Sequence, residues 1–181
     1  MHDLRNKVIG VFLKVLTNKD MGVVNAAKAG LSEILQQHQH KLPKDLLQAS
    51  LRPTLLNLAD YRKLTVPLLD GLGRLLEVLT HCFNITLGEK LLEHFKKRTD
   101  PIKVTVREGD DVEIICAILR IFHLLPHPAA GKFLDDLVTT TLNVISTHAG
   151  GRINNPYLAP LIKYFNVYPK EVCSEYTFFD F

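Results

Sequence analysis

Apolar residues recur at helical spacing along nearly the whole chain, and they do so in paired blocks. Steps of three and four between apolar positions are typical of amphipathic helices that turn one side toward a core. Four such pairs follow one another, beginning near His2, Pro43, Thr86 and Pro128, so the steps between them are close to 41, 43 and 42 residues. HEAT and armadillo repeats have a period of roughly 40–47 residues. The pattern therefore predicts an all-α, HEAT/armadillo-like α-solenoid of about four helical hairpins.

A repeated hairpin buries its apolar face on its neighbours, so we expect this chain to offer surface rather than one central pocket. The expected repeats are approximately 2–42, 43–85, 86–127 and 128–168, followed by an irregular, aromatic-rich tail, 169–181, that is either docked or truncated.

The inward faces of the helices follow from the same spacing. The first helix is expected near 3–16, and its predicted inward residues are Leu4, Val8, Val11, Phe12 and Val15. The fourth helix should bury a regular leucine stripe: Leu68, Leu69, Leu72, Leu75, Leu76 and Leu79. A sixth helix that is apolar on nearly all sides, up to about Leu125, is expected to lie between layers.

Several short polar residues are placed to begin helices. Asp20 precedes an apolar block, and a side-chain oxygen at that position can accept a hydrogen bond from a free N–H of the first turn, while the fourth helix is expected to start at Thr65 with Pro67 in its first turn. The segments beginning at Thr86 and Asp110 have a glutamate three residues later, which predicts capping boxes. Asn155, followed by Pro156, is expected to cap the eighth helix.

Composition fits a folded chain without obvious chemistry. Hydrophobic residues make up 46% and charged residues 23%, which is in the globular range, and the net charge of +3 is mild. The three cysteines are odd in number and far apart, which argues against a disulfide framework. No metal-binding spacing, phosphate-binding loop or catalytic triad can be placed, so we expect no cofactor, no metal and no enzyme activity.

The most distinctive surface feature is basic. Six cations fall within one repeat and its loop: Lys90, Lys96, Lys97, Arg98, Lys103 and Arg107. Three interpretations remain open: a solvated face whose cations complement a helix dipole, a docking site for an acidic protein segment, or a nucleic-acid site. The acidic run that follows, from Glu108 to Glu113, weighs against nucleic acid.

Particular segments narrow the class of helical-repeat protein. The chain resembles the HEAT region of the TRRAP family from about Val23 to Tyr168, in the same order. The segments that carry the resemblance are ASLRPTLLNLA (49–59), PLLDGLGRLLE (67–77), FNITLGEKLLEH (83–94), FHLLP (122–126), GKFLDDLV (131–138) and INNPY (153–157).

The TRRAP family comprises very large pseudokinases. The resemblance implies a nuclear scaffold shared by histone acetyltransferase complexes, including SAGA, that receives acidic transcriptional activators. It also implies that this chain is a slice of the helical region, without the pseudokinase domain, so that no catalytic residue transfers to it. The alternative is a HEAT/armadillo-type transport or trafficking adaptor unrelated to transcription. We also expect a slice of solenoid on its own to be marginally stable or to self-associate.

Overall fold

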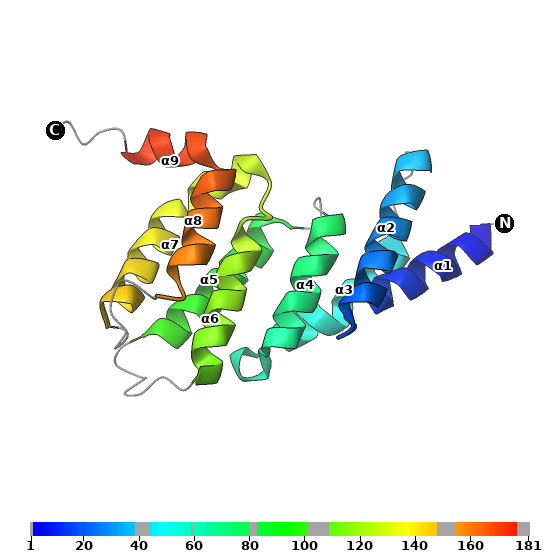
Figure 1. The fold of residues 1–181 in the computed structure, drawn as a ribbon, viewed down its shortest axis with the longest axis horizontal. Coiled ribbons are helices and arrows are strands. Elements are labelled where there is room, and N and C mark those ends of the chain that lie inside the picture. Colours follow the sequence, from blue (N-terminus) through cyan, green and yellow to red (C-terminus); the bar gives the residue numbers. More distant parts are fainter. Residues whose placement is uncertain are drawn as a thin grey trace. The chain divides into compact units, whose positions relative to one another are not determined.

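A computed structural model describes residues 2–38, 44–58, 60–79, 83–100, 109–147 and 155–176. Every regular element in these ranges is helical, which confirms the predicted all-α HEAT-type fold. The elements are α1 His2–Val15, α2 Met21–His38, α3 Lys44–Leu58, a 3-10 turn η1 Tyr61–Lys63, α4 Val66–Val78, α5 Ile85–Thr99, α6 Gly109–Phe122, α7 His127–Thr147, α8 Leu158–Val167 and α9 Pro169–Tyr176 (Figure 1).

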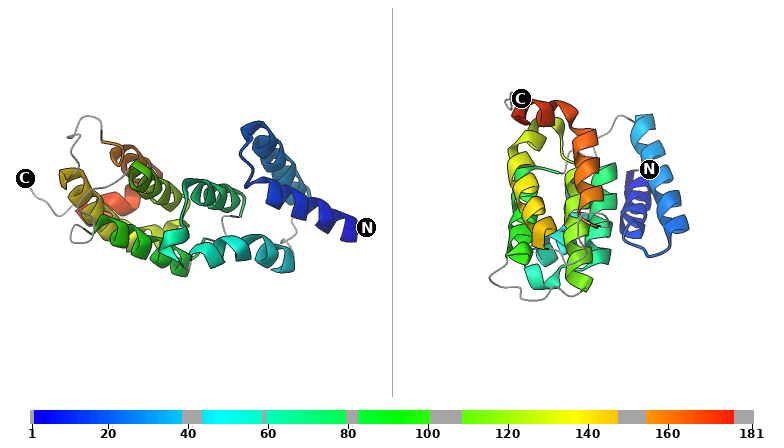
Figure 2. Two further views of the ribbon diagram at one scale, coloured as in Figure 1. Left: turned by 90° about the horizontal axis from the view of Figure 1, so that it is seen from below. Right: turned by 60° about the vertical axis from the view of Figure 1, so that its left-hand side comes forward.

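The chain divides into two compact units, Met1–Leu79 and Thr80–Phe181. In the second unit α5 packs on α6 and α7, and α6 packs on α8, so alternate helices stack on each other. Figure 2 shows this arrangement, with α5 beside α7 and α6 beside α8. The first unit follows the same scheme, because α1 contacts α2 and α3 while α4 contacts α2 and α3. No described helix is long and apolar enough to cross a bilayer.

The predicted cap at Asp20 is confirmed, and Thr65, where the fourth helix was expected to start, caps α4. Asp20 Oδ1 accepts hydrogen bonds from the backbone N–H groups of Gly22 at 2.8 Å and Val23 at 3.3 Å, at the start of α2. The Thr65 hydroxyl accepts from Leu68 N at 3.4 Å, and α4 then buries most of the predicted leucine stripe. Local sequence was sufficient here because a cap and its partners lie within three residues of each other.

Three other caps were wrong in position. α5 begins one residue before Thr86, because Asn84 accepts from Leu87 N at 2.9 Å and is an N-cap residue of at least equal quality. α6 already begins at Gly109, so Asp110 lies inside the first turn. Asn155 Oδ1 accepts a hydrogen bond from Tyr157 N at 3.1 Å, in a turn ahead of α8. The helix itself begins only at Leu158.

The inward face of α1 was predicted correctly only in part: Phe12 lies against Gly30 of α2 and Val15 is half-buried, but the other three residues are wrong. Leu4 and Val11 are 71% and 59% exposed, and Val8 is exposed as well, whereas Ile9, Leu13 and Leu16 are buried. Apolar residues occur on most sides of α1, so periodicity could not select the side that meets α2 and α3.

The ends of the other predicted helices differ less. α6 stops at Phe122, and its residues from Ile114 to Leu119 are all buried, as its apolar character predicted. The described part of the expected irregular tail, Pro169–Tyr176, instead forms α9, which packs on α7 and α8, and residues 177–181 lie outside the described ranges. Cys116 is buried, and Cys82 lies outside the described residues. The proposed repeat boundaries stay predictions.

Candidate protein-interaction surface

Helix α5 carries the described part of the predicted basic cluster. Its inward side consists of buried residues: Leu87, Leu91, Leu92 and Phe95. Lys96, Lys97 and Arg98 form its last turn, where positive charge opposes the negative end of the helix dipole. Lys103 and Arg107 lie outside the described residues.

Two of these lysines share one carboxylate on their own helix. Glu93 accepts from Lys90 Nζ at 2.7 Å through Oε2 and from Lys97 Nζ at 2.5 Å through Oε1. Hydrogen bonds from Lys90 and then Lys97 lower the pKa of Glu93 from its ordinary value of 4.5 to about 2. Glu93 therefore stays ionised throughout the physiological range and offsets part of the positive charge.

The other two cations bind carboxylates of neighbouring helices. Lys96 Nζ lies 2.5 Å from Asp136 Oδ1 on α7, and Arg98 Nη1 donates to Asp111 Oδ1 on α6. The Arg98 side chain is only 12% exposed, so it connects α5 to α6 and presents little surface. The structure thus places Lys90, Lys96 and Lys97 on a surface of mixed charge.

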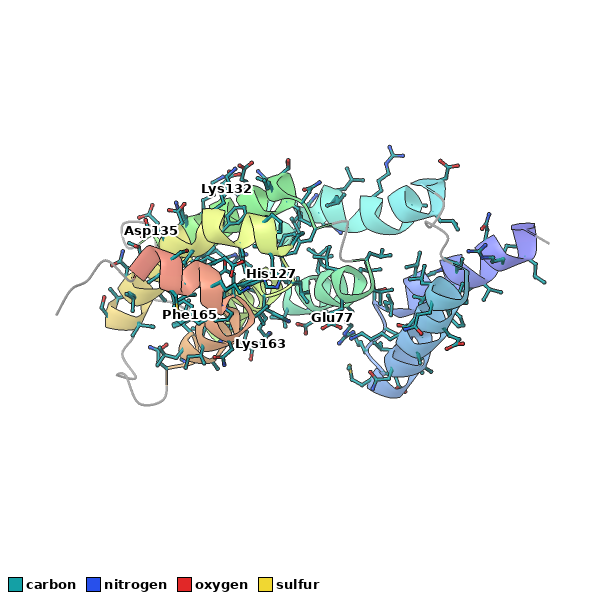
Figure 3. The ribbon with its side chains drawn as sticks, turned by 90° about the horizontal axis from the view of Figure 1, so that it is seen from above. Glu77, His127, Lys132, Asp135, Lys163 and Phe165 are labelled. Carbon is teal, nitrogen blue, oxygen red and sulfur yellow. The ribbon has the colours of Figure 1, made fainter. Side chains whose placement is uncertain are left out.

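Helix α7 contributes a second cross-helix pair that sequence reasoning missed. Lys132 Nζ lies 2.5 Å from Glu89 Oε1. Lys132 and Asp135 lie along α7 in Figure 3, with His127 at the start of the same helix. The two α5–α7 pairs join positions 40 and 43 residues apart, close to the repeat period. A search for opposite charges at that separation would have found them.

A hollow opens where α5 and α7 end. Its volume is about 440 Å³, and its lining residues are Lys96, Thr99, Asp100, Thr140, Asn143, Ser146 and Thr147. Most of them carry hydroxyl, amide or carboxylate oxygens. The hollow lies next to the Lys96–Asp136 pair, because Lys96 is one of its lining residues.

The Cys116 thiol belongs to the buried side of α6. Burial raises the pKa of the Cys116 thiol, whose Sγ lies 3.5 Å from the Pro156 carbonyl oxygen. Among the residues described, no three histidine, cysteine or acidic side chains are placed to hold a metal ion.

Stacked helical hairpins with paired surface charges define the class: a HEAT-repeat segment. Residues 1–180 match the family described as the Tra1 HEAT repeat ring region, and the chain belongs to that family. This confirms the resemblance to the TRRAP family that the sequence segments carry.

Curated relatives support the same assignment. Probable transcription-associated protein 1 of Dictyostelium discoideum is 41% identical over 173 residues, which cover 93% of this chain and 4% of that protein. The SAGA complex/NuA4 acetyltransferase complex subunit TRA1 of Saccharomyces cerevisiae is 35% identical over 170 residues, 91% of this chain and 4% of its own length. The Mus musculus transformation/transcription domain-associated protein is 26% identical over 176 residues, 92% of this chain and 6% of its own. The chain thus spans only a small part of the relatives that it matches.

Proposed function

We propose that this chain is a non-catalytic scaffold segment of a Tra1-type subunit of nuclear histone acetyltransferase complexes. The observation that carries the proposal is the match of residues 1–180 to the Tra1 ring region. The yeast relative is named a subunit of the SAGA and NuA4 acetyltransferase complexes, which supports partners of that kind. A stack of helical hairpins supplies extended faces for binding other proteins.

The test is to tag the endogenous gene, size its product and identify the proteins that co-purify from nuclear extract. We expect a very large product that arrives with acetyltransferase-complex subunits. A small product without those subunits would contradict the proposal and favour the transport-adaptor alternative.

Within this scaffold role, we propose that the α5 surface receives acidic segments of transcriptional activators. Lys90, Lys96 and Lys97 are the described cations that could meet such a segment; Lys103 and Arg107, the other predicted residues, lie outside the described residues. The existing pairs with Glu93 and Asp136 are solvent-exposed, and such pairs typically contribute only about 0.2–1 kcal/mol. An incoming carboxylate can therefore exchange with them at small cost.

A charge-reversal experiment separates this surface from general electrostatics. Lys90, Lys96 and Lys97 are each changed to Glu, and Arg98 is kept because it joins α5 to α6. The matched control reverses three exposed lysines outside α5, Lys19, Lys163 (labelled in Figure 3) and Lys170, so that both variants change the net charge equally. We expect an acidic amphipathic peptide to lose roughly tenfold in affinity for the α5 variant and to bind the control normally. If the peptide bound both variants equally well, the proposal that this surface receives activators would be contradicted.

A further inference from the structure

Glycines on the odd-numbered helices mark places where the following odd-numbered helix packs. A Cβ atom added at Gly10 of α1 would lie 3.8 Å from Cδ2 of Leu46 on α3. A Cβ atom added at Gly88 of α5 would lie 2.7 Å from the Phe133 ring of α7. A side chain of the next helix thus occupies the space that each glycine leaves open, and at Gly88 the occupant is an aromatic ring.

Gly131 of α7 has the same place in its repeat as Gly88 has in the preceding one. It follows Gly88 by 43 residues, one repeat period. A Cβ atom added at Gly131 would meet no atom within 4 Å in the described part of the chain. Gly131 is two residues from Phe133, about 200° around the helix, so it faces away from α5. The notch at Gly131 is therefore open on the side where a following segment would pack.

The face of α7 around this notch is apolar and exposed. Leu142, three turns further along, points in nearly the same direction as Gly131 and is 52% exposed, and Val138 between them is half-buried. Helix α9 meets the start of α7, where His127 Nδ1 lies 3.2 Å from Glu171 Oε1. At about 1.5 Å per residue, α9 is roughly 12 Å long and α7 roughly 31 Å, so α9 cannot cover this whole face.

We propose that the aromatic tail after α9, residues 177–181, docks on this face of α7 with a phenylalanine ring over Gly131. The tail carries three phenylalanines: Phe178, Phe179 and Phe181. Five extended residues span roughly 17 Å, which is also the approximate length of α7 from Gly131 to Leu142. The repeat pattern selects this occupant, because the ring at Gly88 likewise belongs to a phenylalanine of the segment that packs next.

Burial of apolar surface favours this contact. The tail rings and the Leu142 side chain leave water when they meet, and that transfer is favourable. The end of a helical stack also needs a cover for its apolar side chains. The tail would give α7 the cover that α7 gives to α5 at Gly88. The inference does not depend on the proposed function.

The first test locates the tail rings by NMR in the 181-residue chain with labelled Leu and Val methyl groups. We expect nuclear Overhauser effects between phenylalanine ring protons of the tail and the methyl groups of Val138 and Leu142. The combined substitution Phe178→Ser, Phe179→Ser and Phe181→Ser should remove them and shift the Gly131 amide signal. The control Asp180→Asn keeps all three rings and should keep the contacts. A mixture of ring-labelled and methyl-labelled chains tells contacts within one chain from contacts between chains.

Chymotrypsin gives an independent readout, because it cleaves after phenylalanine. A tail docked about two-thirds of the time is cleaved about one third as fast as a free tail. Leu142→Asp should therefore speed cleavage in the tail roughly threefold. The matched control is Ile85→Asp at another exposed apolar residue, on α5, and it should leave the rate unchanged. Gly131→Val should act like Leu142→Asp, and a tail docked this weakly adds little to the stability of the unit.

Circular dichroism confirms that the variants are folded. Equal cleavage rates in Leu142→Asp and Ile85→Asp would overturn the proposal. So would an unmodified chain without ring–methyl contacts, or one whose contacts form only between two copies.

Discussion

At the scale of single residues, the contact between α5 and α7 depends on a glycine. A Cβ atom added at Gly88 would lie only 2.7 Å from Cζ of Phe133 on α7. The Phe133 ring is buried and meets Phe122 edge-on, with ring centroids 5.7 Å apart. Because the ring is enclosed, it cannot move aside easily, and the absence of a side chain at position 88 allows the two helices to approach.

Gly88→Val should therefore destabilise the second unit by about 1–3 kcal/mol, the usual cost of overpacking a core. The free energy of unfolding measured in urea is the test. The size-matched control is Gly131→Val on α7, since an added Cβ there meets no atom within 4 Å. Valine is also the better helix former, so the control should be neutral or slightly stabilising. Equal destabilisation by both variants would show that the Phe133 contact does not matter.

A second prediction at this scale concerns the carboxyl group of Glu93. Its pKa is lowered to about 2 by Lys90 and Lys97, so the pairs contribute stability above pH 4.5, and this contribution is lost as the pH falls toward 2. A ¹³C carboxyl titration by NMR should show the low pKa directly. Changing both lysines to Met should return the pKa toward its ordinary value, whereas Lys163→Met should leave it unchanged. A Glu93 pKa near 4.5 in the unmodified chain would contradict the geometry.

At the scale of elements, two tyrosines attach α8 and the α8–α9 junction to the first turn of α7 and to the turn that precedes it. The Tyr164 hydroxyl donates to Ala130 O at 2.6 Å, and the Tyr168 hydroxyl donates to Leu125 O at 2.6 Å. Both side chains are buried, and burial raises the pKa of both phenols. The His127 ring also packs edge-on against the Tyr168 ring, and its Nδ1 atom lies 3.2 Å from Glu171 Oε1 on α9. The short helix α9 is thereby held to the rest of its unit.

Tyr168→Phe should loosen this junction. Removing the hydroxyl leaves the buried Leu125 carbonyl without its donor, which costs about 1–3 kcal/mol. Hydrogen exchange should increase at the amides of α9 and change little at those of α5. Unchanged protection of α9 would show that apolar packing alone holds this helix.

At the scale of the whole molecule, the chain forms two compact units, each with its own buried core. The first unit exposes an apolar stripe on α1 formed by Leu4, Val8 and Val11. Contiguous exposed apolar surface promotes association with other proteins or other copies.

We therefore predict that the isolated 181-residue chain self-associates through this stripe. Changing Leu4 and Val11 to Glu should shift light scattering toward the monomer mass without loss of helix. Glu substitution at two exposed α2 residues, Asn25 and Ala26, is the control and should leave association unchanged. A clean, stable monomer before any substitution would contradict the prediction.

Features that depend on near neighbours in the sequence were determined by the sequence itself. The cap at Asp20, the start of α4 after Thr65 and the leucine stripe of α4 all follow from spacings of a few residues. The positions of the α5 cations followed in the same way.

Where the sequence offered several equivalent residues for one role, the tertiary structure decided which of them was used. Leu4 and Ile9 are equally apolar, and only contact with α2 and α3 buries one and exposes the other. Asn84 and Thr86 are both capable caps, and the structure uses Asn84. The partners of Lys96 and Arg98, and the hollow beside them, required α6 and α7 to meet α5. Such pairings join residues far apart in the chain, so their energies depend on packing that no local pattern specifies.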